Sequence, residues 1–286
     1  MRLKTYVNYL NPTSAQGTQS NRAFPVLCLH GHPGSGAAMD VFTNALCQPP
    51  FKFTTYAPDL RGYGQSRTAY PFEMTRHLDD LEELLEQYKI EECLVLGWSL
   101  GGILAMELAL RQPKRVKGLI LVGTAARPRG SHPPITLTDN VLTGVAGFIN
   151  WVFPAQRWAI ALGKKSLFRF LLQQHTPIAY RYLARQGAPA FLRTSRHAEA
   201  ALIKAIRAGY NRLPDIKQLE MPALMLCGEC DRHITAEASL ETARALPNCE
   251  AHCYPHTAHL FPWEIPERMS ADICQWLSKH NKIWQL

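Results

Sequence analysis

Residues 96–102 read LGWSLGG and place Ser99 between glycines in the middle of an apolar stretch. The residues before it, 93–96, are typical of a buried strand, and those after it, 103–110, of a helix. Glycine inside either element lowers stability, because it loses more backbone freedom on folding than any other residue. The glycines therefore indicate a tight strand-to-helix turn with Ser99 at its tip.

The pentapeptide 97–101, GWSLG, fits the pattern G-x-S-x-G. In that pattern a strained turn exposes a nucleophilic serine at the end of a strand, and its neighbours must be small because the backbone passes close to them. The alternative is a serine that only caps the following helix. The position between a strand and a helix favours a nucleophile at Ser99.

Apolar runs alternate with helical patterns along most of the chain. Alternation of this kind predicts a mostly parallel sheet covered by helices on both faces. Residues 127–212 break the rhythm, with several helical stretches and no clear strand, so we interpret them as a helical cap (lid) inserted into a core of residues 1–126 and 213–286. The expected strands lie at 24–29, 53–57, 93–96, 116–122, 223–227 and 250–254.

A serine nucleophile needs a base and an orienting acid, which in this type of fold follow it in the order Ser, Asp or Glu, His. Asp231 follows the strand of PALMLCG, and His259 follows the strand in EAHCYPHTAH. An aspartate in this position fixes the histidine tautomer and stabilises the imidazolium. Glu229 is the alternative acid and His256 the alternative base.

Acyl transfer also needs hydrogen-bond donors for the developing oxyanion. The turn HGHPG, residues 30–34, comes before the strand that carries Ser99. We expect the backbone N–H of His32 to be one donor and that of Leu100, directly after the nucleophile, to be the other.

Together these motifs resemble the α/β-hydrolase family, through LHGHPGSG, APDLRGYGQS, LGWSLGG, GECDRHIT and HTAHLFPWEIPE. The resemblance covers nearly all of the chain outside the lid and implies an α/β-hydrolase fold with Ser99, Asp231 and His259 as catalytic residues. A serine nucleophile differs from the aspartate of the related dehalogenases and epoxide hydrolases. The segment NYLNPTSAQGTQSNR, 8–22, is loop-like, which implies a shortened N-terminal hairpin.

These features predict a serine hydrolase that cleaves a carboxylic ester or thioester through an acyl-enzyme, with no metal or organic cofactor. The hexapeptide GWSLGG resembles esterases that demethylate pimeloyl carrier protein, although HGHPGSG departs from their pattern. Two alternatives stay open on the same fold. One is a ligand-binding protein with little turnover, and the other is carbon–carbon bond hydrolysis or cofactor-free haloperoxidation.

The positive charge of the chain is concentrated in the lid. The whole chain carries a net +8, whereas residues 127–212 contain 13 Lys and Arg against two acids, with several aromatic residues between them. A solvated helical surface would explain this pattern. The functional interpretation of the charge is an acidic partner: a carrier protein, an anionic membrane surface or a negatively charged substrate. No nucleic-acid-binding module accompanies the charge. The aromatic residues of the lid predict an acyl or otherwise lipophilic substrate.

Two further patterns carry other interpretations. The apolar stretch 141–162 is interrupted by polar residues, which argues against a membrane span, and the start of the chain does not look like a signal peptide, so we expect a cytoplasmic protein. Cysteines and histidines at 227–256 have spacings that could suggest zinc or a redox pair. Because Cys227 ends an apolar strand, we expect buried and incidental cysteines instead.

Overall fold

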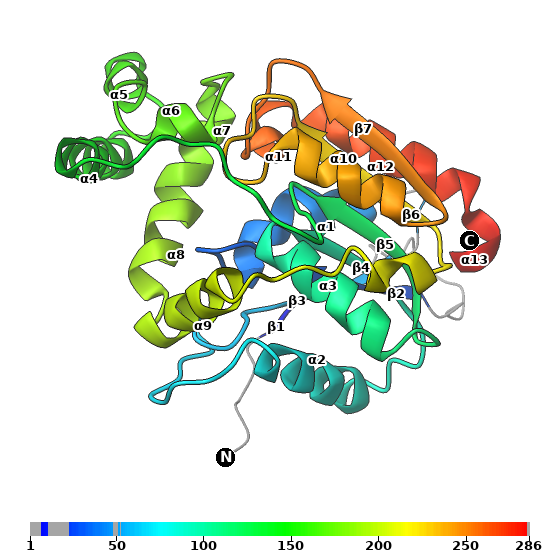
Figure 1. Cartoon of the computed structure of the whole chain (residues 1–286). Coiled ribbons are helices and arrows are strands. Elements are labelled where there is room, and N and C mark those ends of the chain that lie inside the picture. The colour runs from blue at the N-terminus through cyan, green and yellow to red at the C-terminus, as the bar shows by residue number, and fades with distance from the viewer. Residues whose placement is uncertain (1–6, 11–22, 48–50, 52, 285–286) are drawn as a thin grey trace, which may run out of the picture.

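A seven-stranded sheet forms the centre of the computed structural model, which describes residues 7–10, 23–47, 51 and 53–284 (Figure 1). The strand order is β1-β3-β2-β4-β5-β6-β7, and only the pairing of β1 with β3 is antiparallel. The mostly parallel sheet expected from the sequence is therefore confirmed. The strands are β1 (Val7–Leu10), β2 (Phe24–Leu29), β3 (Phe53–Pro58), β4 (Cys93–Trp98), β5 (Val116–Val122), β6 (Ala223–Gly228) and β7 (Cys249–Tyr254).

Helices cover both faces of the sheet. Alternate residues of each strand point to opposite faces, so the apolar side chains on each face pack against a different set of helices. Leu94 and Leu96 of β4 belong to a cluster with helices α1 and α12, whereas Val95 packs with α2, α3 and α10. The helices of the core are η1 (Gly36–Met39), α1 (Asp40–Leu46), α2 (Arg76–Gln87), α3 (Leu100–Arg111), η3 (Asp215–Gln218), α10 (Ala236–Ala245), α11 (Phe261–Glu264), α12 (Pro266–Lys279) and α13 (Asn281–Trp284).

Strand β1 differs from the expectation for the N-terminal segment. Residues 8–10 were expected to be loop-like, but they form part of β1, with Val7 opposite Pro58 of β3. The strand is only four residues long and lies at the sheet edge, where pairing with β3 rather than an alternating apolar pattern holds it. The rest of that segment, 11–22, lies outside the described residues.

A helical insertion separates β5 from β6. Residues 123–222, all of them described, contain no strand. The insertion lies beyond the carboxyl ends of the strands, with α4 and α5 farthest from the sheet (Figure 1). Its helices are α4 (Leu137–Val152), α5 (Arg157–Gly163), α6 (Phe168–Leu171), α7 (Pro177–Tyr182), η2 (Leu183–Gly187), α8 (Ala188–Arg193) and α9 (Arg196–Arg207).

The two ends of the insertion meet at one point. The Arg212 N–H donates a 2.8 Å hydrogen bond to the Ala126 carbonyl, and the Arg212 side chain pairs with Glu107 of α3 at 2.7 Å.

In the part of the chain that the structure describes, no helix combines the length and apolar character that crossing a membrane requires.

Candidate active site

Ser99 occupies the turn between β4 and α3 in a strained backbone conformation. Its φ of 54° and ψ of −115° are rarely adopted by a residue with a side chain, and such a conformation costs about 1–3 kcal/mol. Two hydrogen bonds from the end of β5 hold the turn in place. The Ser99 N–H donates to the Val122 carbonyl, and the Ser99 carbonyl accepts from the Thr124 hydroxyl, each at 2.8 Å.

Close backbone contacts explain the glycines around Ser99. A Cβ at Gly101 would lie 2.0 Å from the Leu29 carbonyl oxygen, and one at Gly97 would lie 2.3 Å from the Gly101 oxygen. Neither backbone neighbour can move aside as a flexible side chain would. The glycines therefore allow α3 to start directly against the ends of β2 and β4.

Asp231 and His259 form a buried hydrogen-bonded pair. Asp231 Oδ2 lies 2.7 Å from His259 Nδ1, and the two residues are 3% and 5% exposed. The other oxygen, Oδ1, accepts from the N–H groups of His233 at 2.8 Å and Ile234 at 3.1 Å. Since the carboxylate can only accept, it favours the tautomer with the proton on Nδ1 and leaves Nε2 without one.

The imidazole of His259 lies beside the strand ends that carry Ser99. A Cβ at Gly123, the residue after β5, would be 3.6 Å from the His259 ring. The ring centroid of Trp98, next to Ser99, is 5.7 Å away. Among the hydrogen bonds of the described residues, none joins the Ser99 hydroxyl to His259. The structure thus joins Asp231 to His259 directly and places Ser99 in the neighbouring turn.

The two alternative residues from the sequence lie in a different arrangement. Glu229 is exposed and accepts a 3.0 Å hydrogen bond from the backbone N–H of His256. His256, also exposed, has a φ of 55° at the turn after β7. Their contact therefore shapes that turn.

The turn after β2 is held by hydrogen bonds of the buried His30 ring. His30 Nε2 accepts from the Leu60 N–H at 3.0 Å, so its proton lies on Nδ1, which contacts the Gly31 carbonyl at 2.8 Å. Burial lowers the pKa of His30 to about 4 and keeps this ring neutral. Within the hydrogen bonds of the described chain, the backbone N–H groups of His32 and Leu100 have no acceptor.

Glu264 is a buried residue of the site that the sequence reasoning did not identify. Its carboxylate is 5% exposed and accepts three backbone hydrogen bonds, from Ala258 at 2.9 Å, Gln174 at 2.5 Å and Gln173 at 3.2 Å. Burial raises its pKa, and the three N–H groups act in the opposite direction. Ala258 immediately precedes His259, so Glu264 connects the His259 loop to the helical insertion. The only sequence signal was a glutamate in the apolar run LFPWEI.

An aromatic cluster lies beside Trp98 and includes a residue of the insertion. Tyr182 of α7 stacks on Trp263 with ring centroids 3.7 Å apart, and Trp98 meets Trp263 edge-on at 4.9 Å. The Trp98 Nε1 is buried without a hydrogen-bond partner among the described residues. The insertion therefore contacts the residue next to Ser99 through this cluster.

Histidines also line the acid loop. The His233 ring lies 5.2 Å from His259 and 5.4 Å from His132, measured between centroids. Burial, and then the neighbouring His259, lower the pKa of His233 to about 4. His233 is thus neutral near pH 7 and adds no charge beside the Asp231–His259 pair.

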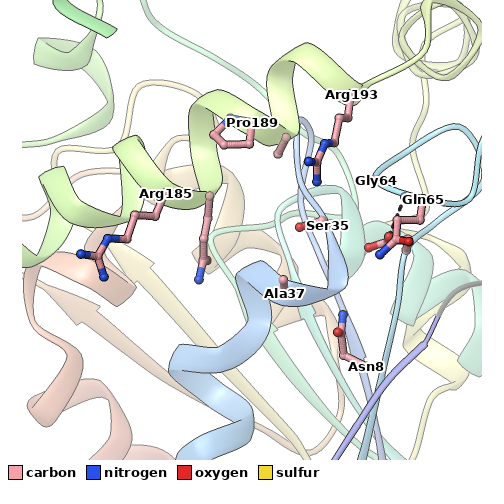
Figure 2. A pocket seen from close by; sticks show the side chains of 11 residues that line it. Asn8, Ser35, Ala37, Gly64, Gln65, Arg185, Pro189 and Arg193 are labelled. Carbon is pink, nitrogen blue, oxygen red and sulfur yellow. Dashed lines mark hydrogen bonds between the residues drawn. The ribbon is translucent and has the colours of Figure 1, made fainter. Parts of the chain in front are cut away.

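Two cavities open where the insertion meets the core. One, of about 170 Å³, lies between Arg185 and Arg193 of the insertion and Ser35 and Gln65 of the core (Figure 2). The other, of about 480 Å³, shares Gln65 and Arg193 with it. Ser99, Asp231 and His259 line neither cavity, so both are separate from the three predicted catalytic residues.

No ligand set for a metal ion assembles near these residues. Within the described ranges, no three His, Cys, Asp or Glu side chains gather closely enough to hold a metal ion. The cysteines singled out from the sequence divide between a buried Cys227 at the end of β6 and partly or fully exposed positions.

Comparison with known families gives a match over most of the chain. The sequence profile of the alpha/beta hydrolase fold matches residues 25–266. An uncharacterised hydrolase of Bacillus subtilis is 26% identical over 285 residues, which cover 95% of this chain and 93% of the relative. A pimeloyl-[acyl-carrier protein] methyl ester esterase of Vibrio campbellii is 25% identical over 249 residues, which cover 82% of this chain and 87% of the relative.

Solved structures show the same architecture. An esterase from Exiguobacterium antarcticum superimposes with a TM-score of 0.69 at 18% identity and covers 96% of both chains. At that identity the likeness establishes the fold.

Proposed function

The chain belongs to the α/β-hydrolase family and is a hydrolytic enzyme; on this premise we propose that it is a serine hydrolase that cleaves a carboxylic ester or thioester. The observation that carries the proposal is the buried Asp231–His259 hydrogen bond of 2.7 Å beside the strained Ser99 turn. Backbone strain and a preset histidine tautomer have a clear use if Ser99 is the nucleophile.

In the proposed reaction, His259 Nε2 takes the proton from Ser99 Oγ as this oxygen attacks the carbonyl carbon. The oxyanion of the tetrahedral intermediate accepts hydrogen bonds from the N–H groups of His32 and Leu100. The imidazolium, stabilised by Asp231, then protonates the leaving alcohol or thiol, and an acyl-enzyme remains on Ser99. His259 Nε2 then takes a proton from water as the water oxygen attacks the acyl carbon, and it returns this proton to Ser99 Oγ as the acyl–oxygen bond breaks, which releases the acid and restores the free Ser99 hydroxyl.

The helical insertion acts as a lid in this proposal, with residues 127–212 as the lid and 1–126 and 213–286 as the core. The hydrogen bond between Arg212 and Ala126 supports these boundaries, because it brings the two ends of the insertion together. Tyr182 of the insertion stacks on Trp263, which contacts Trp98. These aromatic contacts between the insertion and the residue next to Ser99 support an ester with an apolar acyl group as the substrate.

The test is covalent labelling of Ser99 with a fluorophosphonate, followed by intact mass and by hydrolysis of p-nitrophenyl esters of increasing chain length. We expect one adduct on the wild type, none on Ser99→Ala, slow labelling of His259→Ala, and faster hydrolysis of the longer esters. Equal labelling of Ser99→Ala would refute Ser99 as the nucleophile. A folded wild-type protein that neither labels nor hydrolyses any ester would favour a ligand-binding protein on this fold.

A carrier-protein methyl ester is a more specific candidate substrate. It is favoured by the relative from Vibrio campbellii, named for that activity, and by the basic lid. Release of methanol from a methyl-ester acyl group on acyl carrier protein, faster than from the same ester free in solution, would support it. Equal rates would leave the free ester as the substrate.

A further inference from the structure

One side of α4 is a continuous apolar surface exposed to solvent. Leu137 is 80%, Phe148 62% and Trp151 58% exposed. At about 100° per residue, the exposed apolar positions and one glycine fall together within about 120° of the helix circumference. We call these residues the α4 stripe: Leu137, Val141, Gly144, Val145, Phe148, Trp151 and Val152.

The opposite side of α4 attaches the helix to the rest of the insertion. Ala146 and Asn150 are buried, and Asn150 Nδ2 donates to the Tyr180 carbonyl at 2.8 Å. The packing of α4 against the rest of the insertion therefore does not use the α4 stripe. An apolar surface left out of this packing is a recognised mark of an interaction site.

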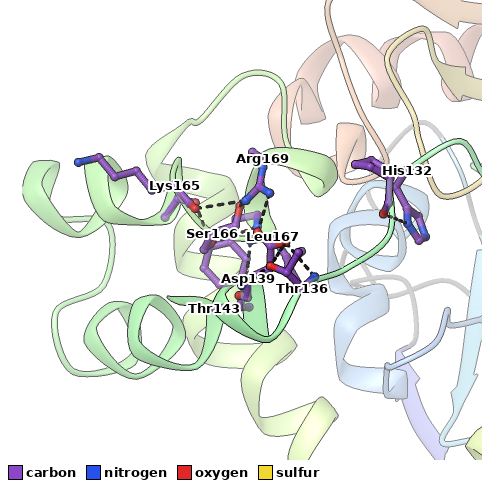
Figure 3. Close-up of polar contacts among 11 residues, drawn as sticks. His132, Thr136, Asp139, Thr143, Lys165, Ser166, Leu167 and Arg169 are labelled. Atoms are coloured by element: carbon purple, nitrogen blue, oxygen red, sulfur yellow. Dashed lines mark hydrogen bonds and ion pairs between the residues drawn. The ribbon is translucent and has the colours of Figure 1, made fainter. Parts of the chain in front are cut away.

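The α4 stripe carries no charge. Asp139 is the only charged residue between Leu137 and Val152, and its carboxylate is turned away from the stripe into a polar network. It accepts from the Thr136 backbone N–H at 3.1 Å and pairs with Arg169 at 2.6 Å, while Lys165 points away from this network (Figure 3). The α4 stripe is thus both apolar and neutral, and the exposed residues Thr138 and Asn140 border it.

Exposed aromatic and basic side chains continue the surface beyond the end of α4. Phe153 and Trp158 are 50% and 53% exposed, with ring centroids 5.3 Å apart. Arg157, Lys164 and Lys165 are exposed on or just after α5, and none of them has an acidic partner among the ion pairs of the described residues. Residues 137–193 contain seven Lys and Arg and one acid, so the surroundings of the stripe are strongly positive.

We infer that the α4 stripe binds the surface of an anionic lipid bilayer. Exposed Trp and Phe next to Lys and Arg are the features by which a helix lies in the interface of a bilayer, with its apolar side among the acyl chains and its cations at the headgroups. The helix spans about 24 Å over its 16 residues and lies farthest from the sheet, where a flat surface can reach it (Figure 1).

The charge pattern favours a bilayer as the partner of the α4 stripe over a second copy of this chain or a small acidic protein. A second copy of this chain would bring the same positive surface against itself. A small acidic protein would be matched by the basic side chains, but not by a neutral apolar stripe of this length. An anionic bilayer complements both features at once. The inference does not depend on the proposed function, because binding requires no reaction at Ser99.

The experiment is flotation of the full-length protein with vesicles of phosphatidylcholine alone or of phosphatidylcholine with phosphatidylglycerol. We expect the wild type and Ser99→Ala to float equally with the anionic vesicles and only weakly with the neutral ones. Trp151→Glu should weaken binding at least about tenfold, because it replaces an apolar ring that would lie among the acyl chains by a charge. Tyr70→Glu is the matched control, since Tyr70 is an aromatic residue that is 70% exposed and lies outside the insertion.

The cationic contribution is tested with equal changes in net charge. Lys164→Glu/Lys165→Glu should abolish the preference for phosphatidylglycerol, whereas Lys114→Glu/Lys217→Glu, at exposed sites of the core, should retain it. Failure of the folded wild type to float, or equal flotation of Trp151→Glu and Tyr70→Glu, would overturn the inference. So would a dimer in solution that Trp151→Glu dissociates, or acyl carrier protein that displaces the vesicles through the stripe.

Discussion

Replacing Glu264 by glutamine tests whether this carboxylate holds the His259 loop in position. The two carboxylate oxygens accept three backbone N–H groups, and the residue is 5% exposed. Glutamine has one accepting oxygen. In either orientation its NH₂ group therefore faces an N–H donor, from Ala258 on one side or from Gln173 and Gln174 on the other.

The size of the effect follows from these contacts. A hydrogen bond to a charged group contributes about 1.5–3 kcal/mol, and at least one is lost while the remaining ones become neutral. Removing a buried charge offsets part of this loss, as the raised pKa of Glu264 indicates. We expect Glu264→Gln to lower the free energy of unfolding by about 2–3 kcal/mol.

Glu264→Gln should also lower the catalytic rate of the protein that remains folded. Since Ala258 adjoins His259, a shift of about 1 Å in this loop costs roughly 100-fold in rate. The fall should appear in kcat, with little change in KM, in assays run well below the unfolding temperature of the variant. Urea unfolding and ester hydrolysis measure the two effects.

Glu229→Gln is the matched control, because Glu229 is exposed and accepts a backbone hydrogen bond from His256. We expect a change within about 0.5 kcal/mol for this surface substitution. If Glu264→Gln behaves like Glu229→Gln in both assays, the proposed positioning role is refuted.

Three other predictions test separate parts of the structure. Asp231→Asn should lower kcat about 10⁴-fold in ester hydrolysis, because the amide no longer favours the required tautomer of His259; a loss under tenfold would contradict this. Gly101→Ala should unfold the protein or lower its free energy of unfolding in urea by more than about 3 kcal/mol, since the new Cβ would lie 2.0 Å from the Leu29 oxygen. Gly144→Ala, with open space around it, should raise the free energy of unfolding by about 0.5–1 kcal/mol. His77 is buried, and this lowers its pKa from 6.5 to about 3. As the pH falls below 6.5, the histidine is therefore protonated in the unfolded chain but stays neutral in the folded chain. Between pH 7 and 5 the wild type should therefore lose about 2 kcal/mol more stability than His77→Phe, and identical losses in urea unfolding at the two pH values would contradict this.

The strands and the serine turn were predictable because their signals are local. LGWSLGG contains both the apolar strand and the glycines that the turn requires, and contacts of Gly97 and Gly101 with the backbone explain those glycines. The Asp231–His259 pairing was also predictable, because parallel strands bring their carboxyl ends to one edge of the sheet. The roles of these side chains in catalysis stay predictions.

Features that depend on distant partners were not predictable. Glu264 acquires its position only when Gln173, Gln174 and Ala258 come together in the fold. The stacking of Tyr182 on Trp263 likewise joins residues of two separate segments. Strand β1 was missed because four residues with mixed polarity give no periodic pattern, and its pairing with β3 becomes visible only in the sheet.

The junction at Ala126 and Arg212 has a consequence for how this protein can diversify. Because one hydrogen bond joins the two ends of this segment, its length adds little to the entropic cost of folding the core, which grows only with the logarithm of loop length. A replacement segment would have to keep the backbone donors that Gln173 and Gln174 supply to Glu264 and the stacking on Trp263. Chimeras joined at these two residues that keep these contacts would test how far the insertion sets the selectivity of this enzyme.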